Sequence, residues 1–158
     1  MSLLEVSGLR KVYKTRFGGN AVEALRNVNF TVGEGEYVAI MGESGSGKTT
    51  LLNILAALDK PTAGTVLLDG RDFTKIRESE AATFRRDHLG FVFQEFNLLD
   101  TFTLEDNIYL PLVLAGKSYD EMRTRLIDIA ETLGIRELLK KYPYEVSGGQ
   151  KQRAAVAR

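Results

Sequence analysis

The sequence contains no cysteine and no tryptophan, has a single histidine and carries no net charge. The absence of cysteine excludes disulfide scaffolds and thiolate metal sites. The 21 acidic residues balance 21 basic residues, which are scattered along the chain. A nucleic-acid partner is therefore not expected, because proteins that bind nucleic acid normally gather a net basic face.

Long hydrophobic runs are also missing. No apolar run approaches the roughly 18 residues that a membrane-spanning helix requires. Residues 1–6 lack the charged-then-apolar pattern of a signal peptide. We therefore expect a cytoplasmic protein that reaches a membrane only through a partner. With 158 residues, of which 44% are hydrophobic, the chain is long enough to bury the core of one domain.

The strongest positive signal is a glycine-rich segment at residues 42–49. It fits the phosphate-loop pattern G-x-x-x-x-G-K-[ST] at every fixed position. An apolar run at residues 37–41 precedes it, and residues 51–58 follow with the apolar spacing of a helix. This order predicts a strand, a loop and a helix that ends near Asp59. The alternative, a Gly/Ser-rich surface turn before an ordinary helix, is disfavoured by this context.

The spacing suits a nucleotide triphosphate with Mg²⁺. Glycines lack a Cβ, so backbone N–H groups can wrap the phosphates, and the helix directs the positive end of its dipole at them. Lys48 supplies a point charge between the β- and γ-phosphates, the Thr49 hydroxyl ligates Mg²⁺, and Thr50 bonds the α-phosphate. The predicted nucleotide-binding residues of this segment are Gly42, Glu43, Ser44, Gly45, Ser46, Gly47, Lys48, Thr49 and Thr50.

A second glycine-containing segment, residues 146–153, precedes a run of helix formers. Ser147 and Gln150 stand at capping-box spacing, which predicts that a helix starts here. Two glycines in that first turn cost about 1 kcal/mol each relative to alanine, so another group is expected to approach this backbone closely. A γ-phosphate is the natural candidate at bare helix amides. Taken alone, Ser-Gly-Gly is more often a flexible hinge with a cap; beside a phosphate loop the anion site is favoured.

At this pair of motifs the chain resembles the nucleotide-binding domain of ABC transporters, in which Ser-Gly-Gly-Gln is the signature sequence. The resemblance spans nearly the whole chain. It implies an α/β fold with a P-loop NTPase core, an N-terminal antiparallel β subdomain and an inserted α-helical subdomain, the C-terminal strands being absent. It divides a single, incomplete ATPase domain (1–158) into a β subdomain and P-loop core (1–93), a Q-loop and helical subdomain (94–146) and the signature helix (147–158).

The resemblance also implies roles for individual residues. Tyr13 is similar to the aromatic residue on which the family stacks adenine. Gln94, after an expected strand at residues 89–93, is similar to the glutamine that bridges Mg²⁺, the attacking water and the membrane partner. Lys48 and Gln94 are the expected catalytic residues, and Thr49 and Gln94 the expected Mg²⁺ ligands.

Residues 88–103 are similar to the ATPase subunits of bacterial exporters related to the macrolide and lipoprotein-release systems, and most of all to the bacitracin-resistance type. This implies a permease that handles antimicrobial peptides or lipid-linked substrates, with the ATPase at the inner face of the membrane. Two copies would meet head to tail around two ATP molecules. The residues contributed to the other copy's ATP are Ser147, Gly148, Gly149 and Gln150. The candidate permease contacts, which are equally candidate core residues, are Phe96, Leu98, Leu99 and Phe102.

Two features of the family are not found. Hydrolysis requires a strand ending in Asp-Glu, but Gly70 follows the apolar residues 66–68 and Asp69, which predicts a β-turn. Asp120 and Glu121 lie at a helix start. The only histidine, His88, precedes the candidate Q-loop, so we expect it to be solvated or at a strand end, without a switch role.

We therefore expect the N-terminal part of a longer ATPase, binding Mg-ATP weakly and turning it over very slowly by itself. An alternative function is a nucleotide-responsive regulatory or scaffold module that does not hydrolyse ATP. A further alternative, a soluble ABC ATPase of DNA repair or translation, is disfavoured by the neutral charge.

The rest of the chain mixes strand and helix signals. Residues 2–41 alternate apolar and polar, with turn residues at 17–20 and 32–36, which predicts strands joined by hairpins. Further expected elements are a strand at 64–68 ended by a turn, a polar helix at 79–86, a helix from 103 and a helix from 119 that Gly134 ends. This last helix has a Ser118–Glu121 capping box and one apolar face made of Tyr119, Met122, Leu126, Ile129, Ala130 and Leu133.

Overall fold

The computed structural model describes residues 2–14 and 21–158. The chain divides into two compact units, Met1–Leu89 and Gly90–Arg158. The predicted turn at residues 17–20 lies outside the described residues. Within the described part, no helix is both long and apolar enough to cross a membrane.

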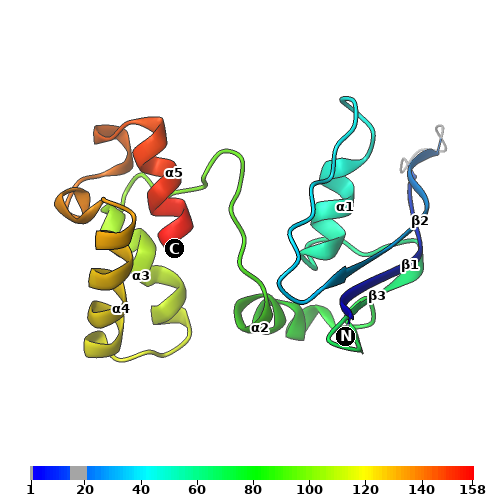
Figure 1. The fold of residues 1–158 in the computed structure, drawn as a ribbon, viewed down its shortest axis with the longest axis horizontal. Coiled ribbons are helices and arrows are strands. Elements are labelled where there is room, and N and C mark those ends of the chain that lie inside the picture. Colours follow the sequence, from blue (N-terminus) through cyan, green and yellow to red (C-terminus); the bar gives the residue numbers. More distant parts are fainter. Residues whose placement is uncertain (1, 15–20) are drawn as a thin grey trace. The chain divides into compact units, whose positions relative to one another are not determined.

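The first unit is built around an antiparallel sheet. Its strands are β1 (Ser2–Tyr13), β2 (Val22–Gly33), β3 (Ala63–Leu68) and β4 (Arg71–Asp72), in the spatial order β2-β1-β3-β4. Helix α1 (Lys48–Leu55) follows β2 along the chain, and helix α2 (Glu78–His88) follows β4 (Figure 1). The predicted N-terminal antiparallel β subdomain, the strand at 64–68 with its turn, and the polar helix are confirmed.

A bulge in β1 brings Val6 and Leu9 to the same face of the sheet. Strict alternation places residues three apart on opposite faces. The register with β2 shifts between Val6 and Leu9, and Gly8 has a φ of 59°. Both side chains are fully buried in one cluster with Leu51 and Ile54 of α1. Burial of such side chains stabilises the fold by about 1.5–3 kcal/mol each, so this face fixes α1 on the sheet.

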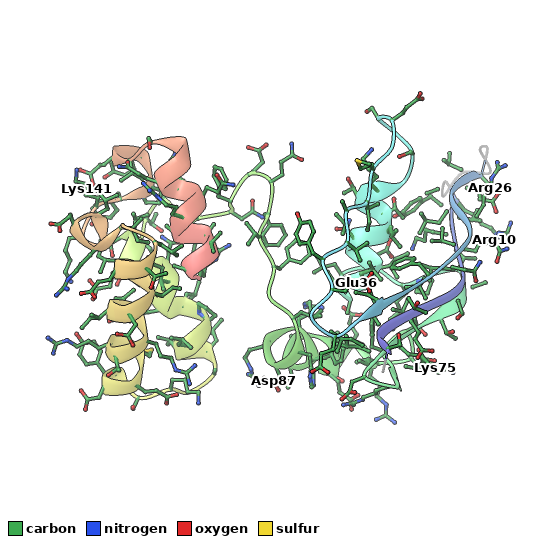
Figure 2. The ribbon with its side chains drawn as sticks, in the orientation of Figure 1. Arg10, Arg26, Glu36, Lys75, Asp87 and Lys141 are labelled. Carbon is green, nitrogen blue, oxygen red and sulfur yellow. The ribbon has the colours of Figure 1, made fainter. Side chains whose placement is uncertain are left out.

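Surface charges contribute less to the pairing of β1 and β2. Glu23 lies 2.6 Å from Arg10 Nε and 2.7 Å from Arg26 Nε, and Figure 2 shows the two arginines close together on this ribbon. The hydrogen bond from Arg10, aided by the Arg26 charge, holds the pKa of Glu23 below its usual value. Exposed ion pairs are worth little, so the buried face sets the register.

Two predicted strands are wrong. Residues 37–41 and 89–93 belong to no strand of the described chain. Tyr37 is 94% exposed and Met41 88%. An apolar run becomes a buried strand only where a neighbouring strand completes its hydrogen bonds and a second layer covers it. Among the described strands, none pairs with either run.

One helix end also needs correction, whereas the prediction for His88 is confirmed in its solvated alternative. Helix α1 ends at Leu55 and not near Asp59, because Ala57 takes a left-handed φ of 52° that ends the helical turn. His88 is exposed, as expected, but it is the last residue of α2 and not a strand end.

The second unit is helical. Its elements are α3 (Leu104–Leu114), α4 (Tyr119–Thr132), two short 3₁₀ helices, η1 (Arg136–Leu138) and η2 (Pro143–Glu145), and α5 (Gly148–Ala157). Helices α3, α4 and α5 contact one another and enclose their own core (Figure 1). The predicted α-helical subdomain is confirmed.

Side-chain caps begin these three helices at the predicted residues. Thr103 caps α3, Ser118 caps α4 and Ser147 caps α5, each accepting from the N–H three residues on. The predicted Ser118–Glu121 capping box is only half formed, because among the described hydrogen bonds Ser118 accepts from the Glu121 N–H but the reciprocal bond is not found. Gly134, with a φ of 61°, follows Leu133, the C-cap residue of α4, and ends this helix as predicted. Tyr119 departs from the expected apolar face, because its side chain is 59% exposed.

The bulge in β1 makes β3 depend on a glycine. A Cβ at residue 64 would lie 2.4 Å from the Gly8 carbonyl oxygen and 2.7 Å from Leu9 Cα, and Gly64 has a φ of +90°. We expect Gly64→Ala to lower the free energy of unfolding by more than about 2 kcal/mol in urea denaturation. Gly70→Ala is the matched control, since Gly70 has a φ of +71° and open space around it. That variant should lose only about 1 kcal/mol from backbone strain. Equal losses for both would contradict the proposed clash.

Candidate functional site

The phosphate-loop segment leads directly into α1. Gly47 is the N-cap residue, with a φ of 91°, and the Leu51 N–H donates to its carbonyl at 2.9 Å. A Cβ at residue 47 would lie 2.4 Å from the Ala24 carbonyl oxygen of β2, so only glycine fits here. The sequence therefore places the loop against the backbone of the sheet, immediately before the first amides of the helix.

Lys48 folds its side chain back over this loop. Its Nζ donates to the carbonyl oxygens of Gly42 at 2.7 Å and Glu43 at 2.6 Å, and lies 3.3 Å from Ser46 Oγ. The ammonium group is thus centred on the segment that the sequence assigns to phosphate. The predicted loop residues from Gly42 to Ser46 are all exposed.

The N-terminus of α1 differs from those of the three capped helices. It has no side-chain cap and no acidic residue in its first turn. Its first amides and the positive end of its dipole are therefore left for an anion, as in a phosphate site. Thr49 is exposed at the second helical position. A hydroxyl oxygen at this place fits Mg²⁺, which binds to one or two protein oxygens together with substrate phosphates.

Tyr13 lies at the end of β1 and is held by two neighbours. Its hydroxyl donates to Asp59 Oδ2 at 2.9 Å, and Lys11 Nζ lies 4.8 Å from the centre of its ring. The same ammonium donates to Asp59 Oδ1 and to the Lys60 carbonyl, both at 2.6 Å. Burial raises the pKa of Asp59, but hydrogen bonds from Lys11, Tyr13 and the Lys60 N–H outweigh it and hold this pKa below its usual value.

These contacts fix the Tyr13 ring beside the segment that follows α1. The ring remains 43% exposed. An aromatic platform for adenine requires this combination of a fixed orientation and an accessible face. The adenine role stays a prediction.

Gln94 is exposed in a turn of the second unit. The Phe96 N–H donates to the Phe93 carbonyl at 3.0 Å, and the Asn97 N–H to the Glu95 carbonyl at 2.7 Å. Phe96 and Asn97 both have a positive φ, 61° and 48°. This conformation is unfavourable for a bulky aromatic residue, so the turn needs support from its surroundings.

The signature segment begins α5 with a complete capping box. The Gln150 N–H donates to Ser147 Oγ at 3.4 Å, and the Ser147 N–H donates to Gln150 Oε1 at 2.8 Å. Ser147, Gly148 and Gly149 are exposed. No atom would lie within 4 Å of a Cβ at either glycine. The chain itself therefore gives no steric reason for glycine at these two positions.

Asn107 is a site-supporting residue that the sequence reasoning missed. It is fully buried on α3, and its Oδ1 accepts from the Leu99 N–H at 2.7 Å. Its Nδ2 donates to the carbonyl oxygens of Leu99, Phe102 and Thr103, at 3.0, 3.2 and 2.9 Å. One amide thus fixes the segment between Gln94 and α3. The available signal was an asparagine at an apolar-face position of a helix, between Leu104 and Ile108.

The structure distributes the predicted site residues over both units. The first unit holds the phosphate loop and Tyr13, whereas the second holds Gln94 and the signature residues. Of the candidate permease contacts, Leu98 packs on the helical core, whereas Leu99 and Phe102 are 43% and 38% exposed. Phe96 is half-buried, and the permease role of these residues stays a prediction.

Comparison with known proteins identifies the family. The family model described as ABC transporter matches residues 25–158. The chain belongs to the ABC transporter family. As an ABC ATP-binding domain, it is 47% identical to the bacitracin export ATP-binding protein BceA of Halalkalibacterium halodurans, over all of this chain and 62% of that protein. It is 42% identical to the macrolide export protein MacB of Pectobacterium atrosepticum, over 99% of this chain and 24% of that protein.

The fold agrees with a solved structure of the same family. A dimeric, post-hydrolysis structure of the ATP-binding cassette MJ0796 with ADP and Pi superposes with a TM-score of 0.88, at 40% identity, over 98% of this chain and 67% of that one. The ABC chain spans about three fifths of the length of the first curated relatives it matches. Both the predicted family and the predicted ABC cassette fold are confirmed.

The buried amide of Asn107 gives a test of the support beneath the Gln94 segment. In Asn107→Asp, a carboxylate would face three carbonyl oxygens, so we expect a loss of about 2–4 kcal/mol in the free energy of unfolding at pH 7. The surrounding oxygens should raise the pKa of this carboxyl in the folded state. Its penalty relative to wild type should then be small below the pKa of an unfolded aspartate, about 4, grow as the pH rises from there toward the raised folded-state pKa, and level off above it. Urea denaturation of both proteins at each pH checks this, and a pH-independent difference would contradict it.

Proposed function

We propose that this chain is the ATP-binding part of a transport ATPase, which binds Mg-ATP and, as a head-to-tail dimer, hydrolyses it to drive a membrane permease. The observation that supports this most is the Lys48 ammonium, centred on a glycine-rich loop at the uncapped start of α1. This arrangement suits an anion with several negatively charged oxygens, which a triphosphate supplies.

Each residue has a definable part in this proposal. The amides of the loop and of the first turn of α1 wrap the phosphates, and Lys48 neutralises charge between the β- and γ-phosphates. The Thr49 hydroxyl and the Gln94 side chain hold Mg²⁺, which supplies electrostatic stabilisation of the charge on the phosphates. Thr50 bonds the α-phosphate, Tyr13 stacks on adenine, and Gln94 also orients the attacking water.

The signature end of α5 completes the site from the second copy. Among the described residues, no side chain or neighbouring segment lies within 4 Å of a Cβ built at either of its two glycines, so an approach from outside would explain them. We propose that the γ-phosphate of ATP held by the other copy binds at Ser147, Gly148, Gly149 and Gln150. The dimeric MJ0796 structure supports this assembly by similarity.

The transported substrate is proposed from relatives. BceA is named for bacitracin export and MacB for macrolide export. We infer a permease that handles antimicrobial peptides or lipid-linked molecules, with the ATPase at the cytoplasmic face of the membrane. Leu99 and Phe102 are the proposed permease contacts, because both are exposed apolar side chains in the segment that joins Gln94 to α3. Among the strands found in residues 2–14 and 21–158 none ends in Asp-Glu, so we propose that residues 1–158 alone turn ATP over very slowly.

Removing the loop ammonium tests nucleotide binding. In the full chain as the cell makes it, Lys48→Ala should weaken ATP binding by more than about tenfold and reduce hydrolysis to background. Lys75→Ala is the matched control, since Lys75 is an exposed lysine of the same unit, paired on the surface with Asp72. Fluorescent-nucleotide titration and phosphate release measure the two effects. A wild-type protein that binds ATP without hydrolysing it would favour the alternative of a regulatory nucleotide-binding module.

Blocking the signature tests the shared site. Ser147→Arg should retain ATP binding by its own phosphate loop but lose hydrolysis, whereas Ser118→Arg, which removes a cap in the same unit, should remain active. Mixing Ser147→Arg with Lys48→Ala protein should restore about a quarter of wild-type activity, because random pairing gives one intact site in half of the dimers. A fully active Ser147→Arg protein, or a mixture no more active than its components, would contradict independent shared sites.

A further inference from the structure

The C-terminal end of α5 is tied to the Gln94 turn by one side chain. Arg158 donates from Nη1 to the Asn97 carbonyl at 2.7 Å and from Nη2 to the Phe96 carbonyl at 3.0 Å. The same helix carries the signature residues at its N-terminus. Helix α5 therefore carries the signature residues at its N-terminal end and is bonded to the Gln94 turn at its C-terminal end.

The guanidinium group fits this turn by shape. Along an extended chain, successive carbonyls point in opposite directions, so a single side chain cannot take two of them in a row. Phe96 and Asn97 both have a positive φ, which directs their carbonyls to the same arginine. The planar fork of arginine presents two N–H groups in parallel, whereas a lysine ammonium offers only a point charge.

Arg158 has these carbonyls and no carboxylate as its partners. None of the ion pairs found among the described residues includes it. Burial lowers the pKa of its guanidinium, so the charge is partly removed from water and depends on the carbonyl oxygens. A partly buried cation of this kind fixes the position of the backbone that it binds.

The Gln94 segment is thus anchored at two points. Asn107 holds the backbone from Leu99 to Thr103, and Arg158 holds Phe96 and Asn97. Gln94 lies in the turn just before the first anchored carbonyl, that of Phe96, and its side chain remains exposed. The strained backbone of the turn would not be expected to keep this conformation without such support.

We propose that Arg158 is a positioning residue for ATP hydrolysis: by holding the Phe96 and Asn97 carbonyls, it sets the position of Gln94 relative to the signature helix. The proposal rests on the proposed function, in which Gln94 holds Mg²⁺ and orients water. Arg158 itself does not touch the nucleotide in this scheme. Its effect therefore passes through Gln94 and changes turnover more than ATP binding.

The first test is Arg158→Lys in the full chain, which keeps the charge and removes the fork. We expect kcat to fall about tenfold while the KM for ATP changes by less than about twofold. The Mg²⁺ concentration for half-maximal activity should rise by at least about threefold, because the ligand supplied by Gln94 is displaced. Arg158→Gln should show the same pattern more strongly. Arg123→Lys is the matched control, since Arg123 is an exposed arginine on α4 of the same unit.

A double-mutant cycle with Gln94→Ala identifies the route of the effect. If Arg158 acts through Gln94, then Arg158→Lys should change kcat by less than about 1.5-fold in the Gln94→Ala background. A full further tenfold loss in that background would overturn the proposal. Loss of ATP binding together with thermal stability in both Arg158 variants would also overturn it, because it would assign Arg158 to the fold alone.

The failure of this proposal can be distinguished from failure of the proposed function. If Gln94→Ala lowers kcat but Arg158→Lys does not, the Arg158 proposal is wrong and the ATPase proposal stands. If Arg158→Lys lowers kcat but Gln94→Ala does not, the route through Gln94 is wrong. If Lys48→Ala leaves hydrolysis unchanged, the proposed nucleotide site is wrong, and the inference about Arg158 falls with it.

Discussion

The phosphate loop depends on the close approach of Gly47 to the backbone of β2. A Cβ at this position would lie 2.4 Å from the Ala24 carbonyl oxygen and 3.0 Å from Leu25 Cδ2. Leu25 is buried in the same cluster as Ile54 of α1, so the contact that seats the loop also seats the helix. Lys48 follows Gly47 directly, and its ammonium is therefore placed by the sheet and not by the loop alone. A site fixed in this way loses little conformational freedom when an anion binds.

In the second unit, too, contacts from regular elements fix a candidate site segment, here one without helix or strand structure. Residues between Gly90 and Thr103 have no helix or strand to satisfy their backbone groups. Besides short-range turn bonds, two side chains from other elements satisfy several of these groups: Asn107 from α3 and Arg158 at the end of α5. Because both anchors contact backbone atoms, they fix the path of the segment without restricting which side chains it presents. Leu99 and Phe102 can then remain exposed while the backbone next to them is held.

The parts of this structure that the sequence predicted are those decided within a few residues. The starts of α1, α4 and α5, the cap at Ser147 and the end of α4 at Gly134 follow from local glycine and capping chemistry. The antiparallel β1–β2 pairing followed from alternation interrupted by turn residues. The strands predicted at 37–41 and 89–93 failed because strand formation needs a partner strand, which composition cannot supply. Arg158 and the turn it binds are 61 residues apart in sequence, and the match between its fork and two left-handed residues exists only in the folded chain.

Glycines in the candidate site fall into two groups with different physical causes. Gly47 is required by the chain itself, because the backbone of β2 leaves no room for a side chain. Gly148 and Gly149 have open space around the missing Cβ, yet they occupy the first turn of a helix, where glycine costs about 1 kcal/mol relative to alanine. Because no contact within the described chain requires glycine here, the loss of helix stability suggests that a group from another molecule approaches this backbone. The Ser147–Gln150 capping box keeps this first turn helical despite that cost, so its outward amides stay in place for a group that approaches closely. The open glycines, more than the capping box, are therefore the physical argument for a partner at this end of α5.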